Sequence, residues 1–219
     1  LIFYIIKKQS YFIYGGALMS GFLLFISFGF IDIETMRPLA AVLNTNFWLS
    51  THVLCITTGY GLCILAAIIA HFYLWNTAYP NKNVQMNDIA SSIKTFSILA
   101  LLLTTIGTAL GGIWADQSWG RFWGWDPKEN GALLIILWLI WLLHGLVAKQ
   151  LSELGFVTGI AFLMIIVSLA WFGVNLLNVG LHSYGFVEGI FLSLLSFILC
   201  EIIIIGSLFF IIKKKRLCL

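Results

Sequence analysis

The sequence has little charge. Asp, Glu, Lys and Arg make up only 10% of its 219 residues, whereas a soluble domain carries about 25% charged residues. Hydrophobic residues make up 61% of the chain. A soluble globular protein is therefore excluded, and the class that fits this composition is an integral membrane protein.

The cysteines also lack any recognisable pairing pattern. The chain has 4 of them, with no C-x-x-C pair and no C-x-x-C-H sequence. This excludes both a thioredoxin-like redox protein and a c-type cytochrome. Free cysteine in an apolar run packs as a small hydrophobe. The first residue is Leu1, not Met, and we expect the chain to be either a piece of a longer polypeptide or a trimmed chain.

What the chain has in place of charge is a series of long apolar runs. A spanning helix needs roughly 20 apolar residues, and in lipid its backbone groups must bond within the helix. The sequence therefore predicts an all-α polytopic membrane protein in a single domain, residues 1–219, with about six spanning helices. Their predicted ranges are 11–31, 53–75, 96–114, 131–148, 156–177 and 189–212. Gly107 and Gly111 form a G-x-x-x-G spacing, a weakly specific pattern that suits close helix packing.

The basic residues predict the orientation. One predicted side holds Lys7, Lys8, Lys82, Lys94, Lys149, Lys213, Lys214, Lys215 and Arg216, and the other holds Arg37, Arg121 and Lys128. Cytoplasmic loops carry the excess of Lys and Arg, so both termini are predicted to be cytoplasmic. The predicted outer segments are 32–52, 115–130 and 178–188. The basic C-terminal tail is predicted to anchor at the membrane surface, and we expect no nucleic-acid partner.

The segment 114–130 is rich in tryptophan. An interfacial aromatic belt accounts for one or two tryptophans at a helix end, but not for a cluster interleaved with Gly120 and Gly124. Small residues let a flat ligand approach the backbone, and aromatic rings bind it by stacking and burial. The pattern favours a platform for a large planar apolar ligand over a simple belt. The tryptophans of the platform are Trp114, Trp119, Trp123 and Trp125.

Two histidines are predicted on the same side as this segment. His52 lies at the outer end of the second predicted span, and His182 lies in the loop after the fifth. Either one alone is most simply a solvated histidine. Because both are placed on the face of the aromatic platform, we expect them to clasp a haem iron from its two sides, since neutral imidazole is a common iron ligand.

The end of the tryptophan-rich segment predicts a helix start. Asp126 is a good N-cap, Pro127 fits the first helical position, and Glu129 sits at the third. Asp126 is also a candidate cofactor-binding residue. Arg121 and Lys128 are the only cations in this segment. They either pair with carboxylates such as haem propionates or are ordinary interfacial charges.

The other intramembrane ionisable residues leave several alternatives. His144 lies 17 residues after Pro127, or roughly 26 Å along a helix, which predicts a second, deeper site or a structural hydrogen bond. His71 has a similar depth and is either its partner or an interfacial histidine. Glu201 is mid-span and is either protonated and bonded to a neighbouring helix or part of a polar path.

The sequence Trp119-Gly-Arg-Phe-Trp-Gly-Trp-Asp-Pro-Lys-Glu129 resembles the tryptophan-rich WWD signature of haem-handling proteins. Together with Trp141-Leu-Leu-His144, Phe47-Trp48-Leu49-Ser-Thr-His52 and Gly180-Leu-His182-Ser-Tyr, it resembles the CcsA/ResC family of System II cytochrome c biogenesis. The resemblance covers essentially the whole chain, and the Leu1 start suggests the C-terminal CcsA part of a fused CcsBA cytochrome c synthase.

This resemblance implies a function. The chain would be the haem lyase component that carries haem b across the membrane and attaches it to the C-x-x-C-H cysteines of apocytochrome c. It implies His52 and His182 as external haem ligands and His144 as a ligand of a transmembrane haem. That second haem would share its iron with a CcsB/ResB-like half, which supplies the other ligand; His71 matches no family ligand. Other implied partners are thiol-reducing proteins and the lipid bilayer. The location would be the bacterial inner membrane with the WWD segment facing the periplasm, or the thylakoid equivalent.

Three other functions remain open. A CcmC-like haem handler would deliver haem to a chaperone, but Pro127-Lys128-Glu129 and His144 favour the CcsA type. A cytochrome b-like electron carrier would place paired histidines within facing spans, which the positions of His52 and His182 do not fit. A haem-free transporter would be supported by inverted repeats, and none is evident in the sequence.

Overall fold

The computed structural model describes residues 46–82, 84–177, 179–182 and 190–217. All of the regular secondary structure in these residues is helical. The helices are α3 (Asn46–Ala78), α4 (Met86–Trp119), α5 (Pro127–Val147), α6 (Glu153–Ser168), the π-helix η3 (Leu169–Gly173), α7 (Val174–Leu176) and α8 (Ile190–Leu217).

Five stretches of these helices are long and apolar enough to cross a membrane. They are Phe47–Ala78, Met86–Trp119, Pro127–Val147, Glu153–Leu176 and Ile190–Leu217. They match the second to sixth predicted spans, so the prediction of an all-α polytopic membrane protein is confirmed. The first predicted span, residues 11–31, lies outside the described residues.

The helices are longer than the predicted spans. α4 continues through Trp114 to Trp119, which the sequence placed in a loop, and it ends where Gly120 takes φ 70° and donates its N–H to the carbonyl of Asp116. A helix needs no apolar sequence to continue beyond the hydrocarbon, because its backbone bonds are internal. Hydropathy therefore sets the buried length of each helix, and the capping residues set its end.

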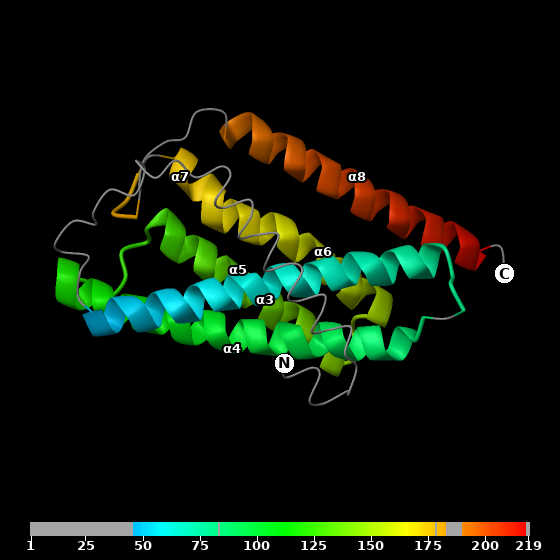
Figure 1. Cartoon of the computed structure of the whole chain (residues 1–219), viewed down its shortest axis with the longest axis horizontal. Helices are drawn as coiled ribbons and strands as arrows, with labels where there is room; N and C mark the ends of the chain where they lie inside the picture. The colour runs from blue at the N-terminus through cyan, green and yellow to red at the C-terminus, as the bar shows by residue number, and fades with distance from the viewer. Residues whose placement is uncertain (1–45, 83, 178, 183–189, 218–219) are drawn as a thin grey trace. The chain divides into compact units, whose positions relative to one another are not determined.

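α3 and α4 form a close antiparallel pair (Figure 1). Small residues allow the approach: a Cβ on Gly59 would lie 2.6 Å from Thr104 Oγ1, and a Cβ on Gly107 would lie 2.9 Å from the backbone nitrogen of Ile56. The G-x-x-x-G spacing thus packs against a partner helix as the sequence predicted.

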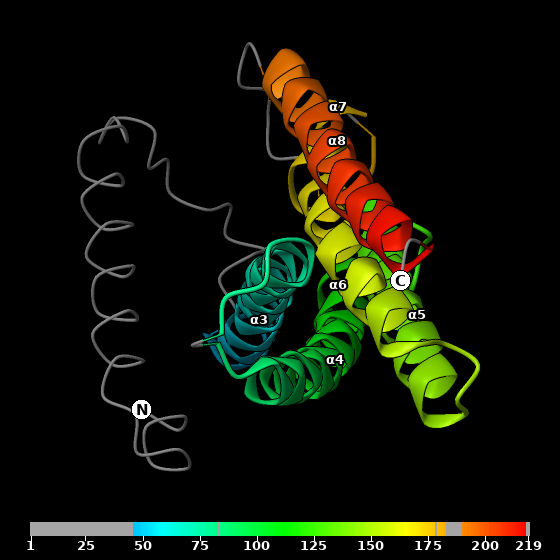
Figure 2. The same ribbon diagram turned by 90° about the vertical axis from the view of Figure 1, so that its right-hand side faces the viewer.

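α6 is the most buried of the spanning helices and packs against α3, α5 and α8. Seen from the end of the bundle in Figure 2, it lies between α8 and α5. Its core side chains Phe156, Ile160 and Leu163 are fully buried. α8 is the least buried span, and only Ile205, Leu208 and Ile212 of its side chains are buried. The bundle core therefore centres on α6.

Candidate functional site

One end of the bundle contains a cavity of about 220 Å³, which we call the histidine cavity. It is lined from α3, α4, α5 and η3 and from the two loops that follow α4 and α7. Its lining includes His52, Tyr60, Gly111, Trp114, Phe122, Trp123, Lys128, Glu129, Trp171 and His182. The two histidines are far apart in the sequence and reach the same space because the antiparallel helices bring their ends together.

His52 lines the cavity, and a hydrogen bond sets the tautomer of its ring. Its Nδ1 lies 2.7 Å from the carbonyl oxygen of Gly107. A carbonyl can only accept, so Nδ1 carries the hydrogen and Nε2 keeps its lone pair. Gly111 makes room for the ring, since a Cβ there would lie 2.6 Å from His52 Cε1. The two glycines of the G-x-x-x-G spacing thus have separate tasks. Gly107 lets α3 pack closely and supplies the carbonyl that accepts from His52 Nδ1. Gly111 leaves space for the imidazole ring of His52.

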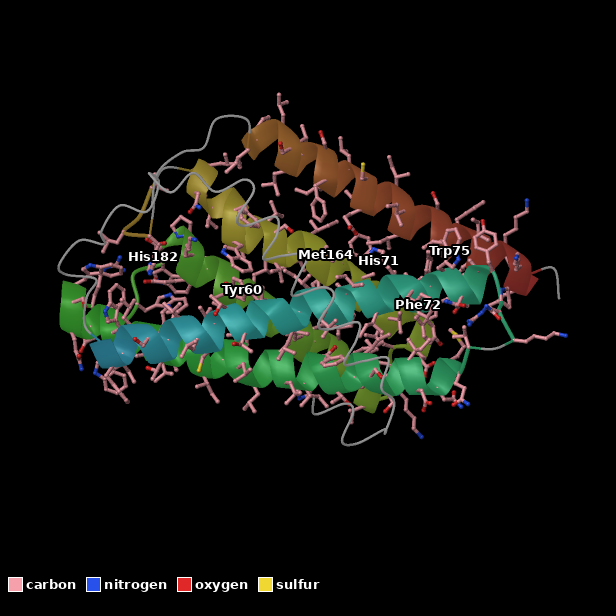
Figure 3. All side chains as sticks on the ribbon, in the orientation of Figure 1. Tyr60, His71, Phe72, Trp75, Met164 and His182 are labelled. Carbon is pink, nitrogen blue, oxygen red and sulfur yellow. The ribbon has the colours of Figure 1, made fainter. Side chains whose placement is uncertain are left out.

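His182 comes from the loop after α7. Its Nδ1 lies 3.2 Å from Asp126 Oδ1, and its ring meets Trp119 edge-on at 5.0 Å between centroids. Burial lowers the pKa of His182 below the usual value, and the carboxylate of Asp126 opposes that shift. With Nδ1 facing an acceptor, the neutral ring carries its lone pair on Nε2. Figure 3 shows His182 near one end of the bundle and Tyr60 in the same half, further toward the middle.

Asp126 joins the loop of His182 to the start of α5. Its Oδ1 accepts from Lys128 N at 3.0 Å, and its Oδ2 accepts from Leu181 N at 2.6 Å. Gly180 has φ 89°, and a Cβ there would collide with the Asp126 carboxylate. The side chain is almost fully buried, and Asp126 is absent from the cavity lining. The predicted N-cap is confirmed, and the contacts with the loop are additional to it.

Glu129 shapes the turn between α4 and α5. Its Oε2 accepts from Gly124 N at 2.8 Å and from Asp126 N at 3.1 Å, which completes a capping box at the start of α5. Its Oε1 lies 3.7 Å from the Arg121 guanidinium. Arg121 is thus engaged within the protein, whereas Lys128 lines the cavity.

The four tryptophans of segment 114–130 have different positions. Trp114 and Trp123 line the cavity, and Trp114 is only 2% exposed. Trp119 supports Trp114 from behind, with ring centroids 4.7 Å apart. Trp125 has φ 57°, meets Trp123 edge-on at 6.0 Å and is 70% exposed. Trp114 and Trp123 therefore form part of the cavity wall, Trp119 packs against Trp114, and Trp125 is exposed.

A further wall comes from η3, which the sequence did not reveal. Trp171 lines the cavity and meets Tyr60 edge-on at 5.6 Å. The carbonyl of Trp171 lies 3.4 Å from Lys128 Nζ, so the π-helix also positions the one lysine of the cavity lining. Single-turn π-helices occur frequently at functional sites. Because η3 depends on tertiary packing, apolar periodicity gives no signal for it.

The other histidines lie away from this cavity. His144 is exposed on α5, with Nδ1 2.9 Å from the carbonyl of Ile140. His71 Nε2 lies 2.9 Å from Glu201 Oε2. The sequence left His71 as a partner of His144 or an interfacial histidine, and the structure places it instead against Glu201. For Glu201 this contact is the bond to a neighbouring helix, one of its two alternatives.

Comparison with known proteins places this arrangement in a family. The family model described as cytochrome C assembly protein matches residues 3–182, which include both cavity histidines and the whole tryptophan-rich segment. The chain belongs to the cytochrome c assembly protein family. The resemblance noted in the sequence is thereby confirmed, and with five candidate spans this family member is an integral membrane protein.

Individual relatives agree with this assignment. The chain is 38% identical over 133 residues to "Protein NrfI" of Wolinella succinogenes, which covers 58% of this chain and 14% of that protein. It is 32% identical over 181 residues to "Cytochrome c biogenesis protein CcsA" of Guillardia theta, which covers 65% of this chain and 59% of the relative. A protein of the same name from Chlamydomonas reinhardtii is 32% identical over 119 residues. The matched part thus spans less than two thirds of each relative's length.

Proposed function

We propose that this family member binds haem b in the histidine cavity and presents it for covalent attachment to the C-x-x-C-H cysteines of apocytochrome c. The observation that carries the proposal is the meeting of His52 and His182 in one cavity, each with Nδ1 facing an acceptor. In the neutral form each ring then carries its lone pair on Nε2, and an imidazole lone pair is what an iron centre takes as a ligand.

The remaining lining suits the other parts of a haem. Trp114, Trp123 and Trp171 offer apolar ring surface to a porphyrin. Lys128 is the cation that would pair with a propionate. Trp119 supports the site through its ring contacts with Trp114 and His182. We assign Arg121 and Asp126 supporting roles, because their charged groups contact Glu129, the loop and His182.

The chemistry then requires positioning more than a catalytic side chain. Each thioether forms when a cysteine S–H adds across a haem vinyl group: sulfur bonds to one vinyl carbon and hydrogen to the other. The substrates supply both reacting groups, so holding the vinyl edge near the peptide is the protein's contribution. The cysteines must arrive as thiols, which implies a thiol-reducing partner.

The proposal includes a membrane location and an orientation. The WWD segment would face the periplasm of a bacterial inner membrane, or the equivalent thylakoid side, following the positive-inside pattern. His144 would serve a second haem together with a ligand from a CcsB/ResB-like half, as the family resemblance implies.

A maturation assay tests the function. The full-length protein, with its CcsB-like half, would be co-expressed with a C-x-x-C-H apocytochrome, and covalent haem would be measured by haem staining after denaturing electrophoresis. His52→Ala and His182→Ala should each reduce covalent haem at least tenfold at equal protein level. Normal maturation in both variants would refute the ligand assignment. Haem found only on a separate chaperone would favour the CcmC-like alternative.

A further inference from the structure

A second polar site lies between α3 and α8, away from the histidine cavity. His71 is 19 residues beyond His52 on α3, or about 28 Å along the axis. Its Nε2 faces Glu201 Oε2 at 2.9 Å, and both atoms are inaccessible to solvent. Figure 3 labels His71 well away from His182 along the bundle. Both residues belong to candidate membrane spans.

The tautomer of His71 is set by its own helix. Its Nδ1 lies 2.8 Å from the carbonyl of Ala67, which can only accept, so Nδ1 carries a hydrogen. In a neutral ring Nε2 then has only a lone pair. An ionised Glu201 also presents only lone pairs. Two such atoms would repel each other at 2.9 Å, and the contact is favourable only if one proton lies between them.

The number of protons follows from the membrane setting. With one shared proton the pair is neutral overall, whether as imidazole with carboxylic acid or as imidazolium with carboxylate. With no proton it would carry one negative charge, and with two it would carry one positive charge. An uncompensated charge within a span is expensive. Geometry and setting therefore both favour a single proton.

Several ionisable groups on the surrounding elements have contacts of their own. Tyr73 donates to Glu153 Oε1 at 2.6 Å, and Lys94 lies 3.8 Å from the other oxygen of Glu153. Lys215 donates to the carbonyl of Ala78 at 2.7 Å. Other titratable side chains on α3 and α8 are those of His52, Cys55, Tyr60, Cys63, Cys200, Lys213, Lys214 and Arg216, and Tyr79 follows directly after α3. Within the described residues, His71 forms its ion contact with Glu201.

The pair also marks one end of the face by which α8 packs. Glu201 is one turn before Ile205, and Leu208, Ile212 and Lys215 continue the same stripe at spacings of three and four residues. Glu201, the first residue of this stripe, contacts His71. Lys215, the last, donates a hydrogen bond to the carbonyl of Ala78. In lipid an apolar stripe gains no hydrophobic driving force, so polar contacts and close packing hold helices together.

We propose that His71 and Glu201 form an intramembrane proton-binding site in which one shared proton docks α8 onto α3. The site is separate from the histidine cavity and does not depend on haem. Glu201→Gln should preserve docking, because a glutamine amide donates a hydrogen to the bare Nε2. Glu201→Ala should weaken it, because nothing then faces His71.

The location of the proton can be measured directly. The full chain, labelled with ¹⁵N-histidine, would be reconstituted in lipid nanodiscs at neutral pH, and the His71 resonance would be assigned by its loss in His71→Gln. We expect either a protonated Nε2 with an ionised Glu201, or a bare Nε2 with a carboxylic-acid band in the infrared spectrum that disappears in Glu201→Gln. A bare Nε2 beside an ionised carboxylate would overturn the proposal, as would protons on both groups.

Docking is tested by a double-mutant cycle. Spin labels at Lys82 and Lys214, in a cysteine-free background, report the distance between the connection after α3 and the end of α8. His71→Ala and Glu201→Ala should each lower the ratio of docked to undocked α8 by about three- to twenty-fold, and the double variant should be no worse than either. Ser196→Ala, at an exposed position on α8, is the matched control. Additive losses, or distances unchanged in both single variants, would overturn the docking role.

Discussion

At the residue level, Asp126 is the link between a helix start and a candidate haem ligand. Its carboxylate accepts backbone hydrogens from Lys128 and Leu181 and faces the Nδ1 of His182. A carboxylate behind a ligating histidine orients the ring and raises its basicity. His52 has a backbone carbonyl in the same position. The two proposed ligands would therefore differ in basicity because of their supporting acceptors.

Replacing Asp126 tests this link. Asp126→Ala should reduce the haem bound to the purified protein severalfold. It should also raise the reduction potential of the haem that stays bound, because no carboxylate then faces the Nδ1 of His182. It should also cost about 1 kcal/mol of stability for the lost N-cap. Ser152→Ala removes the comparable N-cap of α6, whose side chain accepts from Gly155 N, and serves as the control. Equal losses of haem in both variants would reduce Asp126 to a structural role.

Gly111 gives a second test at this scale. Gly111→Ala places a Cβ where His52 now lies, at 2.6 Å from Cε1, and should displace the imidazole. We expect a loss of six-coordinate haem in the absorption spectrum while the protein still folds. Gly61→Ala on α3 is the control, because nothing lies within 4 Å of its added Cβ. An unchanged spectrum in Gly111→Ala would place the His52 ring elsewhere.

Single residues were predictable from the sequence where their role is local. Asp126, Pro127 and Glu129 follow from capping rules that involve only adjacent positions. The close contact between Gly111 and the ring of His52 depends on the register between α3 and α4. The spacing of the glycines in the sequence does not reveal that register. The sequence likewise could not assign His71, because its partner Glu201 lies on α8, far away in the chain.

At the level of elements, η3 contributes a wall of the histidine cavity that hydropathy did not predict. It places Ala170 and Trp171 in the wall, and its carbonyl at Trp171 meets Lys128. Gly131 on α5 lets η3 approach, since a Cβ there would lie 2.8 Å from the Cβ of Ala170. The sequence predicted one continuous span over 156–177, because hydropathy does not distinguish a π turn from an α turn.

A larger residue at Gly131 tests the role of η3. Gly131→Val should push Ala170 and Trp171 away from α5, and overpacking of this kind costs about 1–3 kcal/mol. We expect a lower thermal midpoint together with weaker haem retention. Gly206→Val on α8 has open space around the added side chain and is the control. A destabilised protein that retained haem normally would show that η3 supports the fold but not the cavity.

At the level of the whole molecule, the account depends on which side of the membrane the histidine cavity faces. The fold class was predictable from long apolar runs with few charges, since backbone bonding in lipid allows few alternatives. The orientation is still a prediction from the basic residues. The meeting of His52 and His182 places both on one side of the bundle, and either orientation in the membrane would give it.

Labelling with a membrane-impermeant thiol reagent tests the orientation. In a cysteine-free background, Trp125→Cys should be labelled from outside in intact cells, because Trp125 is 70% exposed beside the cavity. Lys149→Cys, in the connection between α5 and α6, should react only after the membrane is permeabilised. The reverse pattern would place the cavity on the cytoplasmic side and exclude attachment of haem outside.

The most direct test of the central claim is the absorption spectrum of the purified protein, oxidised and reduced, with and without its CcsB-like half. We predict a bis-histidine haem spectrum that is lost or converted to a five-coordinate form in His52→Ala and in His182→Ala. His144→Ala should change the spectrum only when the CcsB-like half is present. A folded protein that carries no haem when made in haem-replete cells, or one whose spectrum ignores both cavity histidines, would contradict the account.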